Sequence, residues 1–429
     1  MSSTNDLVAR DRACVWHPYT QHSTEAAPLA VAHASGSVLR LADGREVIDA
    51  ISSWWATLHG HGHPRIVEAM SRQVAELDHV LFAGATHEPA VALAEELLSV
   101  APPGLSRVFY SDNGSTAVEV ALKMVRQVWC HAGQPQRLVF IALEGAYHGD
   151  TFGTMAIGDP DPFFLPFEPM LFEARRVAPD AGEIARALEE LGDRCAGIVL
   201  EPLIQGAAGM CMQPVSFLRE VRGLCDRYEV PLIADEVMTG FGRTGELFAC
   251  TKAGIEPDLL CLAKGLTGGN FPLSATLTRE QHFNAFLSLE RSKAFFHGHT
   301  FTGNPVGCAV GLASLAICRE EDTPARLERI GALIEANLLD ALAGDERVES
   351  LRRTGGVVAF DLVPPGDTER GYLSDLQPRL RAAALERGVL LRPLGNVLYA
   401  MPPASTTAAQ CERIAEVMIE LVSELEPAR

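Results

Sequence analysis

The middle of the chain alternates short, continuous apolar runs with longer stretches in which apolar residues recur every three or four positions. The apolar runs predict strands at residues 107–111, 138–143, 197–202, 231–235, 258–263 and 273–278. Their lack of apolar–polar alternation is typical of strands buried on both faces of a sheet. The periodic stretches at residues 116–131, 180–191 and 216–228 predict helices between several of these strands. This order predicts an α/β fold, with a mostly parallel sheet sandwiched by helices.

The two ends of the chain have a different pattern. Residues 325–342 and 406–425 have helical periodicity, and residues 356–362, 389–392 and 398–401 resemble strands, which together predict a smaller α+β domain. In the N-terminal part, short strands at residues 37–41 and 47–49 flank the turn "ADGRE", and we expect them to pack with the C-terminal part. We therefore predict an N-terminal segment at residues 1–60, a large domain at 61–320 and a small C-terminal domain at 321–429.

Composition and charge narrow the class of partner. The 429 residues are 47% hydrophobic and 21% charged, typical of a globular protein, and the net charge of −19 disfavours nucleic acid and anionic membrane surfaces. No apolar stretch approaches the length of a membrane span, and the N-terminus lacks the apolar core of a secretory signal. The ten cysteines are scattered without a C-x-x-C pair, which predicts neither a zinc site nor a disulfide framework. We expect a reduced cytoplasmic setting and no metal.

Ligands of parallel sheets bind beyond the carboxyl ends of the strands, so the residues that follow the predicted strands are the candidates for chemistry. After the strand at 107–111, "SDNGSTAVEV" leads directly into a helix. The backbone amides of Gly114, Ser115 and Thr116 would lie at the positive end of that helix and favour an anion. The alternative is an ordinary helix start with Ser115 as the N-cap, and neither a dinucleotide nor a P-loop motif occurs here.

Two further strand ends carry a carboxylate and an aromatic ring. "VPLIADEV" places Asp235 and Glu236 after a strand, where a carboxylate can hold a protonated ring nitrogen, ligate a metal or cap a turn. No His or Cys lies at ligand spacing from them. "GAYHGDT" places Tyr147 in a glycine loop, where its ring can stack on a planar ligand or pack as a surface aromatic.

Lys264 ends an apolar run and is followed closely by three glycines in "CLAKGLTGGNF". An ammonium group is costly to desolvate at such a place. A lysine that forms a Schiff base avoids this cost, because an imine nitrogen replaces the ammonium. An anion cradle, a carboxylate, an aromatic ring and a buried lysine are the groups that pyridoxal 5′-phosphate needs for its phosphate, ring nitrogen, ring face and aldehyde. The sequence therefore predicts an enzyme with this cofactor.

The same residues fall within a longer resemblance. "IADEVMTGFGRTG", followed by "PDLLCLAKGLTGG", is similar to the signature of the class III aminotransferases, which are fold-type I pyridoxal-phosphate enzymes. "SDNGSTAVEVALKM", "YHGDT", "EPLIQGAAGM" and "HGHTFTGNPVGCAV" occur in the order typical of this family, so the resemblance covers nearly the whole chain. It implies a homodimer with shared active sites and a ping-pong transamination.

The resemblance implies a role for each matching residue. Lys264 would form the Schiff base, and Asp235 would pair with the ring nitrogen. Gly114 and Ser115 would hold the phosphate, and Tyr147 would stack on the ring and touch the substrate.

A second group of implied roles falls on the loop "HGHTF". Thr300 would reach the phosphate from a second subunit, and Gly298 would lie along the substrate chain. His299 stands where the family more often has proline. Its backbone can still serve the phosphate, although the loop is less rigid without proline.

Three stretches, "WHPYTQ", "SSWWATLHGHGHP" and "RPLGNVLYAMPP", resemble one branch of the family, whose amino acceptor is a long aliphatic chain ending in a carboxylate. They imply that Tyr19 and Trp54 line the substrate pocket, that Tyr19 also takes part in catalysis, and that Arg392 binds the carboxylate. Core packing of Trp54 and Trp55 and a surface ion pair of Arg392 are the alternatives. Transamination of other ω-amines, an aminomutase reaction and a binding protein that has kept the fold also stay open.

Overall fold

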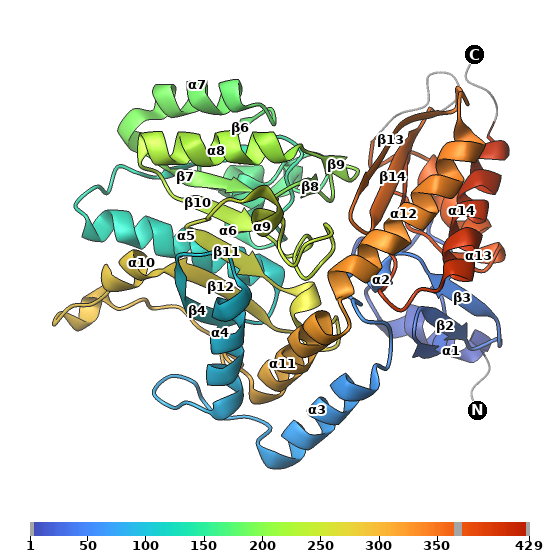
Figure 1. Ribbon diagram of the computed structural model, residues 1–429, viewed down its shortest axis with the longest axis horizontal. Helices are drawn as coiled ribbons and strands as arrows, with labels where there is room; N and C mark the ends of the chain where they lie inside the picture. The colour runs from blue at the N-terminus through green and yellow to red at the C-terminus, as the bar shows by residue number, and fades with distance from the viewer. Residues whose placement is uncertain (1–3, 364–370, 426–429) are drawn as a thin grey trace.

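The computed structural model describes residues 4–363 and 371–425. It has two main parts (Figure 1). A large part surrounds a central sheet, and a smaller part holds the C-terminal helices and strands, with the N-terminal strands beside them. Within the described residues, no helix is long and apolar enough to cross a membrane, and all ten cysteines are free thiols.

The central sheet has seven strands and confirms the predicted α/β fold. Its spatial order is β4 (Leu105–Ser111), β12 (Ser274–Arg279), β11 (Leu259–Leu262), β10 (Leu232–Asp235), β7 (Cys195–Leu200), β5 (Val139–Leu143) and β6 (Ala174–Val177). All neighbouring pairs are parallel except those of β12, which runs antiparallel to both β11 and β4. The six predicted strands agree with the observed ones to within two residues. β6 was missed because this short edge strand, "ARRV", has little apolar character.

Helices cover both faces of the sheet, as predicted. The helices foreseen between strands are α5 (Gly114–His131), α7 (Ala181–Leu191) and α8 (Val215–Tyr228). Alternate residues of β11 pack in opposite directions: Leu259 and Cys261 join the core under α5, whereas Leu260 and Leu262 join the core of the other face. This two-sided burial explains the continuous apolar runs of the strands.

Several helices of the large part were not predicted from the sequence. They are α3 (Pro64–Glu76), α4 (Glu88–Val100), α6 (Phe152–Ile157), α9 (Ala249–Ala253), α10 (Glu280–Asn284) and α11 (Pro305–Glu320). α11 packs against α3 and α4 and is apolar around most of its circumference, "PVGCAVGLASLAICRE". A helix buried on most sides has no polar face, so its periodicity is weak.

Three smaller sheets accompany the central one among the described residues, and the smallest pairs only β8 (Ile204–Gln205) with β9 (Cys211–Met212). The other two are larger. An antiparallel sheet of β13 (Val348–Thr354), β14 (Val357–Leu362) and β16 (Val397–Ala400) lies beside α12 (Thr323–Leu342), α13 (Leu376–Glu386) and α14 (Ala408–Ser423) (Figure 1). The other sheet contains β1 (Val31–Ser35), β2 (Val38–Leu41), β3 (Glu46–Asp49) and β15 (Val389–Leu390). β15 comes from the C-terminal part and pairs in parallel with β3, so both ends of the chain share one sheet. The domain boundaries at residues 60 and 320 stay a prediction.

Candidate active site

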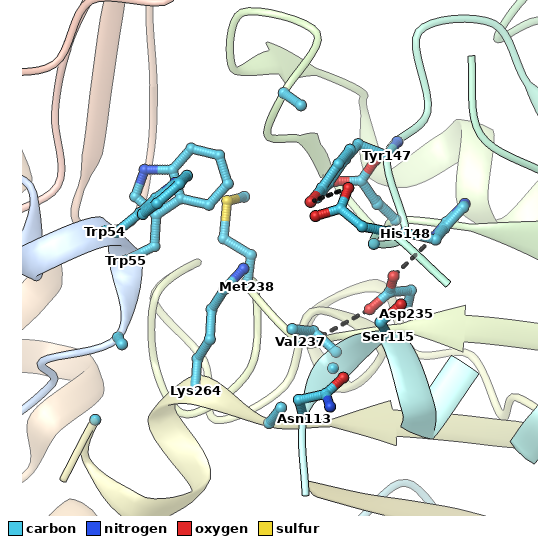
Figure 2. Close-up of a pocket in the computed structure, with 18 of the residues that line it drawn as sticks. Trp54, Trp55, Asn113, Ser115, Tyr147, His148, Asp235, Val237, Met238 and Lys264 are labelled. Carbon is cyan, nitrogen blue, oxygen red and sulfur yellow. Dashed lines mark hydrogen bonds and ion pairs between the residues drawn. The ribbon is translucent and has the colours of Figure 1, made fainter. Parts of the chain in front are cut away.

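A cavity of about 790 Å³ lies where the large part meets the N-terminal and C-terminal segments. Part of its wall is formed by the segments that follow β4, β5, β10 and β11, the strand ends at which ligands of such sheets bind. Figure 2 shows the Lys264 side chain between the Trp54–Trp55 pair on one side and Tyr147 and Asp235 on the other. The predicted residues that line this cavity are Tyr19, Trp54, Gly114, Ser115, Tyr147, Asp235, Lys264 and Arg392.

Lys264 begins the short 3₁₀ helix η3 (Lys264–Thr267) directly after β11, with a left-handed φ of 43°. Its amine lies 4.9 Å from the centroid of the Trp55 ring, and among the described residues it has no hydrogen-bond or ion-pair partner. Burial lowers the pKa of this amine, although the charges of Asp235 and Glu201 oppose the shift. The structure therefore places a lysine of lowered pKa, free to react, inside the cavity.

The chain packs tightly around this lysine. A Cβ atom at Gly269, where φ is 81°, would lie only 2.5 Å from the backbone carbon of Ala56. The glycine loop after Lys264 thus approaches the segment that carries both tryptophans as closely as backbone allows. Only glycine fits there.

Asp235 is the last residue of β10 and is buried, with 5% of its surface exposed. His148 Nδ1 donates to one carboxylate oxygen at 2.7 Å, and the Val237 amide donates to the other at 3.0 Å (Figure 2). Burial alone would lower the pKa of His148, but the hydrogen bond and charge of Asp235 outweigh it, so this pKa is raised. A carboxylate held in this way can keep a proton on a ligand nitrogen.

Glu236, the neighbour of Asp235, has a structural role instead. It accepts the amides of Ala249 and Cys250 at 2.7 and 2.8 Å, and so caps the start of α9. Of the two carboxylates noted in the sequence, only Asp235 lines the cavity.

The N-terminus of α5 offers an anion site, and its N-cap is not the residue named in the alternative interpretation. Asn113, not Ser115, is the N-cap: its side chain accepts the Thr116 amide at 3.0 Å. The Ser115 hydroxyl instead lies 2.9 Å from the Thr151 hydroxyl. Among the described residues, the amides of Gly114 and Ser115 have no partner in the protein, which leaves two N–H donors at the positive end of the helix. Thr116, whose amide is occupied by the cap, does not join them.

Two tyrosines and one carboxylate converge at another wall. The Tyr19 hydroxyl donates to Asp150 Oδ1 at 2.6 Å, the Tyr147 hydroxyl donates to the same oxygen at 3.1 Å, and the two hydroxyls lie 3.0 Å apart. Burial raises the pKa of both phenols, and Asp150 adds to the effect. Both therefore remain protonated at neutral pH. The Tyr147 ring lies at 18° to that of Phe164, with centroids 6.1 Å apart.

Arg392 follows β15 and faces Trp54, with its guanidinium carbon 4.1 Å from the indole centroid. Within the described part of the chain it pairs with no carboxylate, which argues against the surface ion pair considered from the sequence. Trp54 is 36% exposed and contacts Tyr19 edge-to-face at 5.5 Å. Trp55 is the core aromatic of the pair: it is 6% exposed and donates to the Tyr399 hydroxyl at 2.9 Å.

The segment that carries both indoles is unusual. Four consecutive residues, Ser52 to Trp55, have left-handed φ values of 51°, 44°, 73° and 69°, and none is glycine. The left-handed region costs an L-residue roughly 1–2 kcal/mol, so other contacts must offset the strain of this turn. Nothing in the local sequence marks such a conformation.

Gly298, His299 and Thr300 lie outside the cavity of their own chain. Gly298 and Thr300 are exposed, and His299 Nε2 lies 3.8 Å from Asp112 Oδ1 at the start of the α5 segment. A single chain therefore does not bring these three predicted residues to the site, and their roles stay predictions.

Besides Asp150, which accepts both tyrosine hydroxyls, two further residues of the site were not assigned a role from the sequence. His148 supports Asp235, and Glu201 follows β7, lines the cavity and accepts the Tyr147 amide at 3.1 Å. Burial raises the pKa of Glu201 to about 7. The rule that singled out Asp235, a polar residue directly after a buried strand, would also have found Glu201.

Comparison with known proteins identifies the class to which this site belongs. Residues 19–422 match the family model for class III aminotransferases. The chain belongs to the class III aminotransferases, as its motifs had suggested, and its cofactor is pyridoxal 5′-phosphate. It is 46% identical to a Synechococcus elongatus protein named adenosylmethionine-8-amino-7-oxononanoate aminotransferase, over 96% of this chain and 99% of the relative.

Solved structures agree with this assignment. The crystal structure of a protein of the same name from Methanocaldococcus jannaschii has a TM-score of 0.93 and 35% identity, covering 98% of this chain and 99% of the other. An amine transaminase from an uncultivated Pseudomonas species, solved in its PLP-bound form, has a TM-score of 0.88 and 30% identity, covering 96% and 98% of the two chains.

The residues present fit the cofactor. The cavity joins two helix-start amides and a lysine amine that have no partner in the described part of the chain, together with a buried carboxylate. These groups suit a phosphate, an aldehyde and a ring nitrogen respectively. A Cβ atom at Gly114 would lie 2.6 Å from Val237 Cγ1, so only glycine lets this strand-end segment approach the α5 start so closely.

Proposed function

We propose that the protein transfers an amino group to 8-amino-7-oxononanoate, giving 7,8-diaminononanoate, with S-adenosylmethionine as amino donor, a step of biotin biosynthesis. The name shared by the relatives supports this reaction. The observation in this chain that carries it is the Arg392 guanidinium, which has no carboxylate partner among the described residues and is held against Trp54 in the same cavity as the Lys264 amine. Such a site suits a substrate with an anionic group at one end and a reacting carbon at the other.

Each part of the cofactor has a matching group in the chain. When bound, pyridoxal 5′-phosphate supplies an aldehyde that combines with amines and a ring that delocalises negative charge. The amides of Gly114 and Ser115 would hold its phosphate, and Asp235 would hold its ring nitrogen. Lys264 would hold its aldehyde carbon, and Tyr147 lies on the same cavity wall as Asp150.

Lys264 is the group that moves protons. Because its pKa is lowered by burial, its amine can be neutral and act as a base closer to neutral pH than a surface lysine. It takes the proton from the amine-bearing carbon of the donor. In the second half-reaction it gives a proton to C7 of the acceptor.

Asp235 and His148 act together as the electrostatic support. The carboxylate stabilises a proton on the ring nitrogen, while His148, on its far side, holds the carboxylate in place through the 2.7 Å hydrogen bond. The Val237 amide fixes the other oxygen, so the carboxylate cannot rotate away from the cavity.

The remaining groups select the acceptor. Its aliphatic chain suits the faces of Trp54 and Tyr19, and its carboxylate suits the Arg392 guanidinium, which can form two parallel hydrogen bonds. The Tyr19 and Tyr147 hydroxyls, gathered at Asp150, present polar groups to the amino–oxo end. These substrate roles are part of the proposal.

The test follows each half-reaction by the absorbance of the bound cofactor. Addition of S-adenosylmethionine to the purified holoenzyme should convert the cofactor to its amine form, and 8-amino-7-oxononanoate should restore it, with diaminononanoate found by mass spectrometry. Lysine and ornithine serve as alternative donors. Failure of the acceptor to restore the spectrum with any donor would overturn the proposal, and turnover without a separate acceptor would indicate an aminomutase.

A homodimer completes the proposed site. The loop with Gly298, His299 and Thr300 lies outside its own cavity, which supports the prediction that Thr300 serves the phosphate of a second copy. A cytoplasmic location stays a prediction from the sequence.

A further inference from the structure

The left-handed turn from Ser52 to Trp55 brings one indole against the Arg392 guanidinium and the other against the Lys264 amine. Trp54 lies 4.1 Å from the guanidinium carbon of Arg392, and Trp55 lies 4.9 Å from the amine of Lys264. The carboxylate anchor and the reacting amine therefore both contact the same short, strained turn.

One buried carboxylate caps this turn. Asp49, the last residue of β3, is fully buried. Its Oδ1 accepts the Ser53 amide at 2.9 Å and the Ile51 amide at 3.3 Å. Its Oδ2 accepts the Ser53 hydroxyl at 2.7 Å and hydrogen-bonds with His61 Nε2 at 2.9 Å.

The contacts of the cap are themselves anchored. His61 pairs with Gly36 through two backbone hydrogen bonds of 2.7 and 3.0 Å, which hold the His61 backbone against the turn between β1 and β2. The Ser52 hydroxyl donates to the Met401 carbonyl at 2.7 Å from the other side of the turn. Burial opposes ionisation of Asp49, but the hydrogen bonds of His61 and Ser53 outweigh it, and the pKa of the carboxyl is lowered.

We propose that Asp49 is a positioning residue for catalysis: by capping the left-handed turn, its carboxylate sets where Trp54 meets Arg392 and where Trp55 meets Lys264. Asp49 itself contacts neither Arg392 nor Lys264 and does not line the cavity. The inference rests on the proposed function for its substrate readout, but the geometry of the turn can be tested without any substrate.

The first test compares Asp49→Ala, Asp49→Asn and Asp49→Ala/Ser53→Gly. Alanine removes all four contacts, and we expect KM for the acceptor to rise at least tenfold and kcat to fall. Asparagine keeps an oxygen for both amides and can donate to Ser53 and His61. KM and kcat of Asp49→Asn should therefore stay within about threefold of the wild-type values. Glycine adopts positive φ at little cost. Adding Asp49→Ala to the Ser53→Gly variant should therefore change KM and kcat much less than adding Asp49→Ala to the wild type.

A matched control removes a different buried carboxylate. Asp258 pairs with Arg222 and Arg279 at the amino end of β11 and is absent from the cavity wall. Asp258→Ala should lower stability without raising KM. If Asp49→Ala, like Asp258→Ala, lowers stability without raising KM for the acceptor, that result would overturn the proposal.

The second test needs neither cofactor nor turnover. In a Trp16→Phe/Trp129→Phe background, only Trp54 and Trp55 fluoresce. Loss of the cap should loosen the turn, so Asp49→Ala should raise the constant for acrylamide quenching of the Trp54 and Trp55 fluorescence about twofold. Ser53→Gly should reverse this change. Unchanged quenching would overturn the inference, whereas failure of the wild-type enzyme to use the acceptor would count only against the proposed function. If Asp49→Ala does not fold, Asp49→Ser with and without Ser53→Gly answers the same question, because serine keeps one acceptor.

Discussion

The guanidinium of Arg392 lies over the indole of Trp54, 4.1 Å from the ring centroid. The two residues meet because β15 pairs in parallel with β3, with Leu390 opposite Asp49. Because the two strands are parallel, their carboxyl ends lie side by side. The segment after β3 leads to Trp54, and the segment after β15 leads to Arg392. This pairing brings the two ends of the chain together at the substrate side of the cavity.

Arg392→Ala should act mainly on the acceptor half-reaction. A charge-assisted pair contributes about 1.5–3 kcal/mol, so the acceptor should bind about 10- to 150-fold more weakly. Both half-reactions are measured by cofactor absorbance in single-turnover experiments. Arg413→Ala, which breaks ion pairs with Glu416 and Glu420 on α14, is the matched control. Unchanged acceptor affinity in Arg392→Ala would mean that the carboxylate is held elsewhere.

Lys264→Ala should abolish turnover and leave a folded protein that still binds the cofactor non-covalently. The amine has no partner among the described residues, so its removal breaks no hydrogen bond of the fold. Borohydride reduction of the wild-type holoenzyme, followed by peptide mass analysis, should find the cofactor on Lys264. Label on another lysine would refute the assignment.

Asp235→Asn should slow both half-reactions on the order of 100- to 1000-fold, because a neutral amide stabilises a proton on the ring nitrogen far less well. Glu236→Gln is the neighbouring control. Glu236 caps α9, so its substitution should lower the free energy of unfolding by about 1–3 kcal/mol while half-reaction rates stay near normal. If the two variants show the same kinetics, Asp235 is only a structural residue.

Mixed dimers test the role of Thr300. Lys264→Ala and Thr300→Ala homodimers should each have low activity. If Thr300 serves the site of a second copy, a heterodimer of the two variants contains one intact site and should recover up to half of the wild-type activity. Differently tagged chains, co-expressed and purified through both tags, provide the heterodimer. If Thr300 serves its own chain, no intact site forms and activity stays low.

Glu201 should make the stability of the cofactor-free protein depend on pH. Its pKa is raised from the usual 4.5 to about 7 in the folded state. The folded state therefore binds more protons than the unfolded state between these values, and the free energy of unfolding falls as the pH rises through this window. This one group accounts for about 3 kcal/mol, to be measured by urea unfolding at pH 4.5 and 8.

Glu201→Gln provides the comparison for this pH effect. Glutamine does not titrate, so the difference between wild type and variant should change by about 3 kcal/mol over the window. A constant difference across the window would show that Glu201 keeps an ordinary pKa.

The sequence alone determined the central sheet and most of the residues that would bind the cofactor. Strands buried on both faces must be continuously apolar, so their ends are visible, and the residues after them must meet at one edge. Asp235, Lys264 and Gly114 were found in this way. The sequence also left open an ordinary helix start with Ser115 as the N-cap of α5. The structure has Asn113 in that role, and the sequence could not distinguish them because several residues of "SDNGST" are good caps.

Only the tertiary structure decided the part of the cavity that would hold the substrate, around Trp54 and Arg392. The left-handed turn at Ser52–Trp55 has no glycine to reveal it, and the contacts that hold it come from Asp49, His61 and Met401, the last of them far away in the chain. The pairing of β15 with β3 is equally remote in sequence. Contacts between distant segments depend on the packing of the whole chain, and no local pattern records them. Both tryptophans line the cavity, and that packing alone decides which of them is partly exposed beside Arg392 and which is buried beside Lys264.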